Sequence, residues 1–172
     1  MKLEGDLSDN QNDPGGITRY GISLRFIRSL DPPALKRYGL MNYPDNPERM
    51  ESLPWETAYR LYEGEFWQHA PFGDIPSQKL CNDVFDSSVN QGIGNAIKCL
   101  QRAVWASSGG SLITDDGIMG PKTIQAVQKC AQRELQAAFR AERAWAYRRV
   151  ADLNPQCKIF LKGWLRRAYW PD

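Results

Sequence analysis

The chain has 172 residues, a length that predicts one compact domain or one with a small appendage and excludes two large domains. Of these residues 42% are apolar, 24% are charged and 19 are aromatic, a composition that excludes a disordered or collagen-like protein. No run of about 18 apolar residues is present to cross a membrane, and the first residues lack the apolar region of a signal peptide. Residues 1–86 carry 9 basic and 14 acidic side chains while residues 87–172 carry 13 and 6, which predicts an acidic site and a basic docking face, or else two differently solvated surfaces.

The first half of the chain is predicted to hold a turn-rich corner followed by helices. Residues 5–22 are dominated by turn formers and predict a structured loop or short hairpin. Apolar residues at helical spacing then predict one helix over 22–30, a short one ending at Tyr38 and, after a loop, one from Pro54 up to Pro71.

The second half is predicted to be entirely helical apart from a loop over 107–120. The same apolar period predicts helices over 78–90 and 93–106, a helix of about 30 residues that begins at Pro121, and a last helix around 159–165. No segment with a strand period is longer than the one near Gly16 to Ile22. The predicted fold is therefore mainly α, with a small loop or β-hairpin corner near the N-terminus.

Cysteine and histidine offer little material for metal or redox chemistry. Cys81, Cys99, Cys130 and Cys157 are too far apart in sequence for a zinc or thioredoxin motif, and we expect buried free thiols rather than disulfides. The single histidine, His69, has no cysteine near it and is expected in solvent at a helix end. We therefore expect no metal site.

Carboxylates remain the most abundant groups that could catalyse a reaction. Glu4 and Asp13 are separated by eight residues rich in turn formers, and Thr18 follows five positions later. Glycoside hydrolysis needs one protonated carboxyl to donate a proton to the leaving oxygen and one carboxylate to position water or attack the sugar. The residues alone leave a second interpretation open, because a DPGG segment is also an ordinary turn.

Four ordered motifs between residues 4 and 126 resemble one enzyme family. They are Glu4-Gly5 with DPGGITRYGIS at 13–23, Glu65-Phe66-Trp67, VFDSSVNQG at 84–92, and a last group formed by Leu100-Gln101, Asp116-Gly117, Gly120-Pro121 and TIQA at 123–126. In this order they are similar to the glycoside hydrolase family 108 N-acetylmuramidases, which are lysozyme-like enzymes common among phage endolysins and prophages. The last group resembles the peptidoglycan-binding region of these enzymes.

The resemblance implies a lysozyme-like fold and cleavage of the β-1,4 bond between N-acetylmuramic acid and N-acetylglucosamine. Glu4 stands at the position of the family's catalytic glutamate and is expected to act as the general acid. Asp13 and Thr18 are expected to position the water, as in the similar Glu, Asp and Thr arrangement of phage T4-type lysozymes. This chemistry needs no cofactor.

Several other side chains are candidates for contact with the substrate. Tyr20 and Trp67 could stack on sugar rings, although aromatic residues at helical spacing are more often core. Asp86 and Asn90 lie one helical turn apart and could line the cleft, while Asn90 could equally cap a helix. For Asp116 the resemblance implies a contact with the peptide stem, and the alternative is a loop that leads into a helix.

The expected organisation is a catalytic lysozyme-like region at 1–76 and a helical peptidoglycan-binding region at 77–172, packed as one compact unit. The expected partner is the glycan strand of peptidoglycan, with no nucleic acid and no stable membrane insertion. We expect a monomer that acts in the periplasm or at the cell wall.

Two features keep alternatives open. Family members normally have a helix before the glutamate, whereas only Met1-Lys2-Leu3 precedes Glu4, so either an N-terminal helix or signal-anchor was removed or the site is held differently. The family's Glu-Gly-Gly-Tyr also reads Glu4-Gly5-Asp6-Leu7 here. A wall-binding module without catalytic activity is therefore one rival, and a basic nucleic-acid-binding protein that uses the arginines of 140–167 is another.

Overall fold

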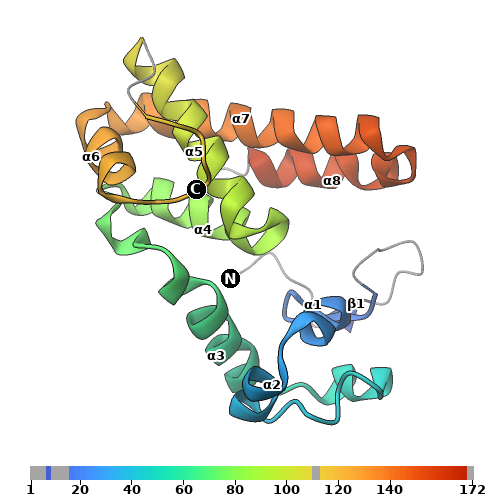
Figure 1. Cartoon of the computed structure of the whole chain (residues 1–172). Helices are drawn as coiled ribbons and strands as arrows, with labels where there is room; N and C mark the ends of the chain where they lie inside the picture. Colours follow the sequence, from blue (N-terminus) through green and yellow to red (C-terminus); the bar gives the residue numbers. More distant parts are fainter. Residues whose placement is uncertain (1–6, 9–15, 110–112, 170–172) are drawn as a thin grey trace. The chain divides into compact units, whose positions relative to one another are not determined.

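The computed structural model describes residues 7–8, 16–109 and 113–169, and the chain divides into two compact units, Met1–Glu65 and Phe66–Asp172. The described part is mainly helical with one small antiparallel sheet near the N-terminus, which confirms the predicted fold class (Figure 1).

The first unit combines the small sheet with short helices. Its elements are the strands β1 (Leu7–Ser8), β2 (Thr18–Arg19) and β3 (Ile22–Ser23), the helices α1 (Leu24–Ser29), α2 (Pro32–Tyr38) and α3 (Trp55–Glu65), and the 3-10 helix η1 (Pro47–Ser52). β2 lies between β1 and β3 and is antiparallel to both.

Local sequence explains where these helices begin and end. The Ser23 hydroxyl accepts a hydrogen bond from the backbone N–H of Phe26 and so caps α1, and Asp31 caps α2 in the same way through Ala34. α2 ends at Gly39 because this residue adopts the left-handed conformation. The segment 39–53, predicted as a loop, contains the 3-10 helix η1. The long helix predicted from Pro54 up to Pro71 ends earlier, at Glu65.

The second unit is a helical assembly. Its elements are the 3-10 helices η2 (Trp67–His69), η3 (Phe72–Asp74) and η4 (Pro155–Cys157), and the helices α4 (Gln78–Gln91), α5 (Ile93–Ser108), α6 (Pro121–Lys129), α7 (Gln132–Leu153) and α8 (Lys158–Ala168). α4, α5 and α6 pack against α7, and α8 returns alongside α7 as the second arm of a helical hairpin (Figure 1).

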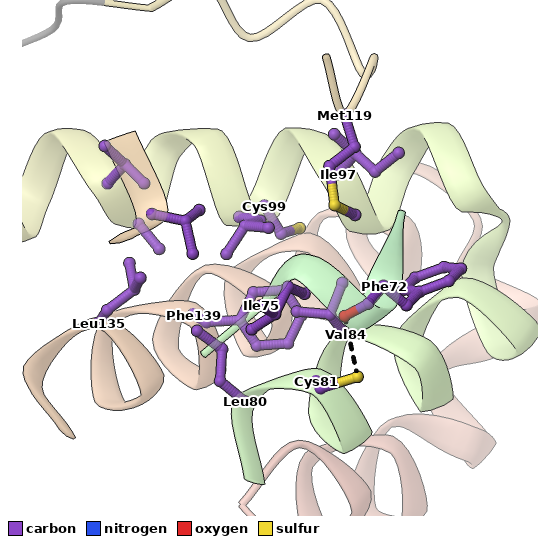
Figure 2. Packing of buried hydrophobic residues seen from close by; sticks show 14 residues of the cluster. Phe72, Ile75, Leu80, Cys81, Val84, Ile97, Cys99, Met119, Leu135 and Phe139 are labelled. Carbon is purple, nitrogen blue, oxygen red and sulfur yellow. Dashed lines mark hydrogen bonds between the residues drawn. The ribbon is translucent and has the colours of Figure 1, made fainter. Parts of the chain in front are cut away.

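The core of the second unit lies where α4, α5 and α7 meet. Figure 2 shows Phe72, Leu80, Val84 and Phe139 in this cluster, all of them buried. The Sγ–H of Cys81 donates a hydrogen bond to the Phe72 carbonyl oxygen at 3.3 Å, which ties η3 to α4. The periodicity of the sequence thus identified the core-facing sides of these helices.

The single helix predicted from Pro121 over about 30 residues is wrong, because the chain forms α6 and α7 with a break between them. Cys130 is extended, with ψ at 148°, and ends α6. The side-chain amide of Gln132 donates to the carbonyl oxygens of Val127 and Cys130, so carbonyls left open at the end of α6 find a partner. Trp145 and Val150, predicted on the apolar face, are 46% and 41% exposed.

All four cysteines are free, as the sequence predicts, and Cys81 and Cys99 are buried. Burial raises the pKa of the Cys99 thiol to about 11, so it remains protonated and unreactive near neutral pH. His69 is exposed in η2. Among the described residues no helix has both the length and the apolar character that a bilayer crossing requires.

Gly64 allows α3 to approach α2 closely, and this contact generates a stability prediction. A Cβ at position 64 would overlap the Tyr38 hydroxyl oxygen and come within 3.2 Å of Cζ. We expect Gly64→Ala to destabilise the protein by about 2 kcal/mol through overpacking, although alanine favours helix by about 1 kcal/mol. Urea denaturation measures the change.

Tyr38→Phe provides the matched background, because it removes the oxygen that the added methyl group would meet. Gly64→Ala should cost clearly less in this background than in the wild type, which a double-mutant cycle detects. Equal costs in both backgrounds would contradict a steric origin of the destabilisation.

Candidate functional site

The predicted catalytic residues Glu4 and Asp13 lie outside the described residues, but the strands that flank them are described. β1 begins three residues after Glu4, and the segment that contains Asp13 connects β1 to β2. Leu7 pairs with Arg19 and Ser8 pairs with Thr18, so the two ends of this segment meet in one strand pair. Asp13 thus belongs in sequence to the connection between two paired strands, and Glu4 to the segment before the first of them.

Thr18, the third predicted catalytic residue, lies on the central strand of this sheet. It pairs with Ser8 on one side and with Ser23 on the other. Its hydroxyl donates a hydrogen bond to the Gly16 carbonyl oxygen at 3.3 Å, and the residue is half-buried. A hydroxyl has a further acceptor capacity, so Thr18 can still orient a water molecule.

Tyr20 occupies a strained position in the turn between β2 and β3. Tyr20 has φ at +49° and Gly21 at +77°, so the two central residues of this two-residue hairpin turn are both left-handed. Among the described residues Tyr20 is the one non-glycine residue with positive φ. Such a conformation costs about 1–3 kcal/mol, and strain of this kind is concentrated at functional sites.

Contacts from other elements hold Tyr20 in this conformation. The Tyr62 hydroxyl on α3 donates a hydrogen bond to the Tyr20 carbonyl oxygen at 2.7 Å. The Arg19 guanidinium lies over the Tyr20 ring at 4.8 Å, and the ring meets Trp55 edge-on with centroids 5.5 Å apart. Tyr62 on α3 thus restrains the backbone of Tyr20, while Arg19 on β2 and Trp55 on α3 restrain its ring.

Trp55 and Tyr59 extend this aromatic group along α3. They are 43% and 56% exposed, and a spacing of four residues places them on the same face of the helix. Together with Tyr20 they make up what we call the aromatic face of the first unit. Exposed, rigid aromatic rings of this kind are suited to contact the apolar faces of sugar rings.

Trp67, the other predicted stacking residue, belongs to the second unit. Its ring stacks on Phe72 at 5.5 Å and meets Phe85 edge-on at 5.4 Å. The residue is nevertheless 41% exposed. One side of the Trp67 ring thus packs in an aromatic cluster and the other side is exposed to solvent. The residue therefore has features of both alternatives that the sequence left open, a core residue and a residue available to stack on a sugar.

Asp86 and Asn90 do share a face of α4, and both bind residues of the second unit. The Asp86 carboxylate accepts hydrogen bonds from Arg143 on α7 and from Arg167 on α8, the latter with an Nη2 to Oδ1 distance of 2.7 Å. The Asn90 side-chain oxygen accepts a hydrogen bond from the Tyr147 hydroxyl at 2.6 Å, and Tyr147 accepts one from Arg143. Their contact with substrate stays a prediction.

The environment of Asp86 favours its ionised form. Burial acts to raise the pKa of Asp86, but the hydrogen bonds and charges of Arg167 and Arg143 outweigh it, so the pKa lies below its ordinary value. Arg143 is 1% exposed, which makes this carboxylate its necessary counter-charge. The cluster therefore links α4, α7 and α8.

Asp116 lies in a loop that Gln101 of α5 fastens. The buried amide of Gln101 donates to Asp116 Oδ1, to the Ile118 carbonyl oxygen and to the Thr123 hydroxyl, and its oxygen accepts from the backbone N–H of Gly117. Gly117 has φ at +80°, and a Cβ there would be 2.9 Å from the Gly94 carbonyl oxygen. Hydrogen bonds from Gln101 and from the Ile118 N–H lower the pKa of Asp116.

Two residues have contacts that sequence reasoning missed. Arg143 is among the arginines of 140–167 on which the nucleic-acid-binding alternative depends. The spacing of Asp83 and Asp86 on α4, however, matches that of Arg140 and Arg143 on α7, and these side chains form two ion pairs. The second residue is Trp145, which helical periodicity predicts on the apolar face. Its half-exposed ring is flanked by the guanidinium groups of Arg102 and Arg149, at 5.7 and 5.4 Å.

The sequence matches two protein-family models, and the structure matches a solved structure. Residues 1–92 match the family model described as "Glycosyl hydrolase 108", and residues 95–169 match the one described as "Predicted Peptidoglycan domain". The chain is similar to the solved structure of Brucella abortus SagA, with 25% identity and a TM-score of 0.71 over 96% of this chain and 82% of that chain. No curated protein matches the sequence significantly.

The Asp86 cluster predicts a loss of stability in acid. Because the folded-state pKa of Asp86 lies below the unfolded value of about 3.9, its contribution is present above that value and is lost as the pH falls through the folded pKa. Asp86→Asn leaves Arg143 buried without its counter-charge, so we expect a loss of about 3 kcal/mol at neutral pH.

Denaturation curves between neutral and acid pH test this prediction. The difference between wild type and Asp86→Asn should shrink as the pH falls below about 4. Asp152→Asn, at an exposed position of α7, is the matched control and should change stability by less than about 0.5 kcal/mol. A difference that does not depend on pH would contradict the role of the ionised carboxylate.

Proposed function

The chain belongs to the glycosyl hydrolase 108 family, as its motifs predict, and on this premise we propose that it cleaves the β-1,4 bond between N-acetylmuramic acid and N-acetylglucosamine. It is a lysozyme-like glycoside hydrolase that acts on peptidoglycan. The observation that carries the proposal is the family match over residues 1–92, because this range contains Glu4, Asp13 and Thr18 together with the motif that ends at Gly92.

In the proposed mechanism Glu4 is the general acid. It donates its proton to the bridging oxygen as the bond to the sugar carbon breaks. The ionised carboxylate of Asp13 and the hydroxyl of Thr18 position the water. Its oxygen bonds to the sugar carbon, and the proton it releases replaces, overall, the one that Glu4 donated. The position of Thr18 on the central strand supports this role, since a strand fixes the hydroxyl more firmly than a loop does.

Tyr20 is the proposed sugar contact in the first unit. Its ring is held by Arg19 and Trp55, and its backbone by Tyr62, so little conformational entropy is lost when a sugar binds. Trp67 is the proposed contact in the second unit because its exposed side is backed by Phe72 and Phe85.

We assign catalysis to residues 1–76 and the holding of peptidoglycan to residues 77–172. The match to a peptidoglycan domain over 95–169 and the basic charge of the second half support this division, since the stem peptides of peptidoglycan carry free carboxylates. The monomeric enzyme would act in the periplasm or at the cell wall.

Glu4→Gln tests the proposed acid. We expect activity on purified sacculi to fall at least about 100-fold, because an amide cannot donate the proton and a general acid contributes 10²–10⁴-fold. Glu63→Gln, at an exposed position of α3, is the matched control and should leave activity unchanged. The measurements are the loss of turbidity and mass spectrometry of the released fragments.

The fragments identify the bond that is cut. New reducing ends on muramic acid support the proposal, whereas reducing ends on glucosamine or cut peptides would contradict it. Unchanged activity of Glu4→Gln would remove this residue from its proposed role. Circular dichroism of both variants verifies that they are folded.

Tyr20→Asn tests the proposed sugar contact. Asparagine tolerates the left-handed conformation of this position but has no ring, so the turn should form while stacking is lost. We expect KM for soluble peptidoglycan fragments to rise about tenfold with little change in kcat, since stacking contributes about 1–3 kcal/mol in related ring contacts. Tyr20→Phe keeps the ring and loses only the hydrogen bond that Arg19 donates to the Tyr20 hydroxyl at 3.2 Å, so its KM should stay much closer to wild type than that of Tyr20→Asn. A decrease confined to kcat would contradict a binding role.

A further inference from the structure

We propose that the tip of the α7–α8 hairpin docks on the surface of an anionic lipid membrane. The tip comprises the last turn of α7, η4 and the first turn of α8. Leu153 is 70% exposed, Ile159 is 62% exposed and Val150 is 41% exposed. These three residues lie within nine positions of each other, on either side of the connection between α7 and α8, where the chain turns back at one end of the hairpin (Figure 1).

Basic side chains surround these aliphatic residues. Arg148 and Arg149 precede Val150 on α7, and Lys158 and Lys162 flank Ile159 on α8, all of them exposed. Asp152 is the one acidic residue in the stretch 143–169. A protruding group of aliphatic side chains within a basic surround is the composition of protein segments that bind at the interface of anionic membranes.

The aliphatic residues favour lipid over the other anionic surfaces. Sugar rings and nucleic-acid bases are bound mainly by aromatic side chains and hydrogen-bonding groups. The aromatic residue of the tip, Phe160, is half-buried and stacks on Trp164 with ring centroids 5.9 Å apart, and the Asn154 amide donates to the Val150 carbonyl oxygen within the tip. Transfer of Leu, Ile and Val side chains from water to the boundary between headgroups and acyl chains is favourable in free energy, while Lys and Arg keep their charges at the headgroup level.

The hairpin is built firmly enough to present this tip. Between its arms Ala144, Tyr147 and Ala168 are buried, and Leu161, Trp164 and Leu165 pack against them. Arg167 of α8 and Arg143 of α7 bind the same Asp86 carboxylate at the base of the hairpin. The exposed residues of the tip are therefore not needed to hold the arms together, and they can be changed without loss of the fold.

Vesicle binding of Leu153→Glu/Ile159→Glu tests the proposal. Wild type should cosediment with vesicles of phosphatidylethanolamine and phosphatidylglycerol, and much less with phosphatidylcholine vesicles. The double variant should bind the anionic vesicles at least about tenfold more weakly, because it loses aliphatic contact and adds negative charge. Raising the salt concentration should weaken wild-type binding.

Ile118→Glu is the matched control, since Ile118 is 66% exposed in the loop before α6, away from the tip in sequence. It should bind vesicles as wild type does. The proposal is overturned if wild type does not bind anionic vesicles, if it binds phosphatidylcholine equally well, or if Ile118→Glu loses as much binding as the tip variant.

Two further measurements separate membrane docking from hydrolysis and from self-association. Leu153→Ser/Ile159→Ser removes the aliphatic contact without adding charge, so it should hydrolyse short soluble peptidoglycan fragments as wild type does while its binding to anionic vesicles falls. The proposed bond specificity is read from the released fragments, and its failure would leave the vesicle result unaffected. Analytical ultracentrifugation should give the same mass for both proteins. A wild-type dimer that the variant abolishes, with vesicle binding unchanged, would identify the tip as a surface for a second copy and contradict membrane docking.

Discussion

The pairing of Asp86 with Arg143 and Arg167 is the constraint on which the second unit depends. A guanidinium as buried as that of Arg143 costs several kcal/mol unless a carboxylate neutralises it. One carboxylate on α4 meets this need and also receives α8, so three helices can be placed together only in an arrangement that brings these groups into contact. Tyr147 and Asn90 extend the same network by hydrogen bonds. The region that matches a peptidoglycan domain is thus held together by this ion-pair cluster as well as by an apolar core.

The first unit relies on a different device, a strained turn supported from α3. Tyr20 adopts its left-handed conformation although a tyrosine there is costly, and the hydrogen bond from Tyr62 offsets part of this cost. The turn sets the pairing of β2 with β3, and β2 carries Thr18. Support of the turn by a neighbouring helix therefore bears on the proposed catalytic hydroxyl as well as on the proposed sugar contact.

Sequence periodicity predicts what depends on local burial and misses what depends on tertiary partners. Val84, Leu100 and Phe139 were predictable core residues because each repeats with its neighbours at helical spacing. The break between α6 and α7 at Cys130 could not be predicted in this way, because the apolar period continues across it. The hydrogen bonds from the Gln132 amide to the carbonyl oxygens of Val127 and Cys130 are recognised only in the three-dimensional structure. Similarly, a motif predicts catalytic roles for Glu4 and Asp13, whereas the strain at Tyr20 and the burial of Arg143 follow from contacts made by distant segments.

The distribution of charge connects these observations to binding. The second half of the chain has an excess of basic residues, but Asp83 and Asp86 pair with Arg140, Arg143 and Arg167 at the base of the hairpin. Neutralised charges contribute little to the field outside the protein. The remaining basic residues of the hairpin therefore dominate its distal part, where Arg148, Lys158 and Lys162 are exposed. Because Leu153 and Ile159 are exposed at the same end of the hairpin, this end offers positive charge to an anionic partner and aliphatic surface to an apolar one.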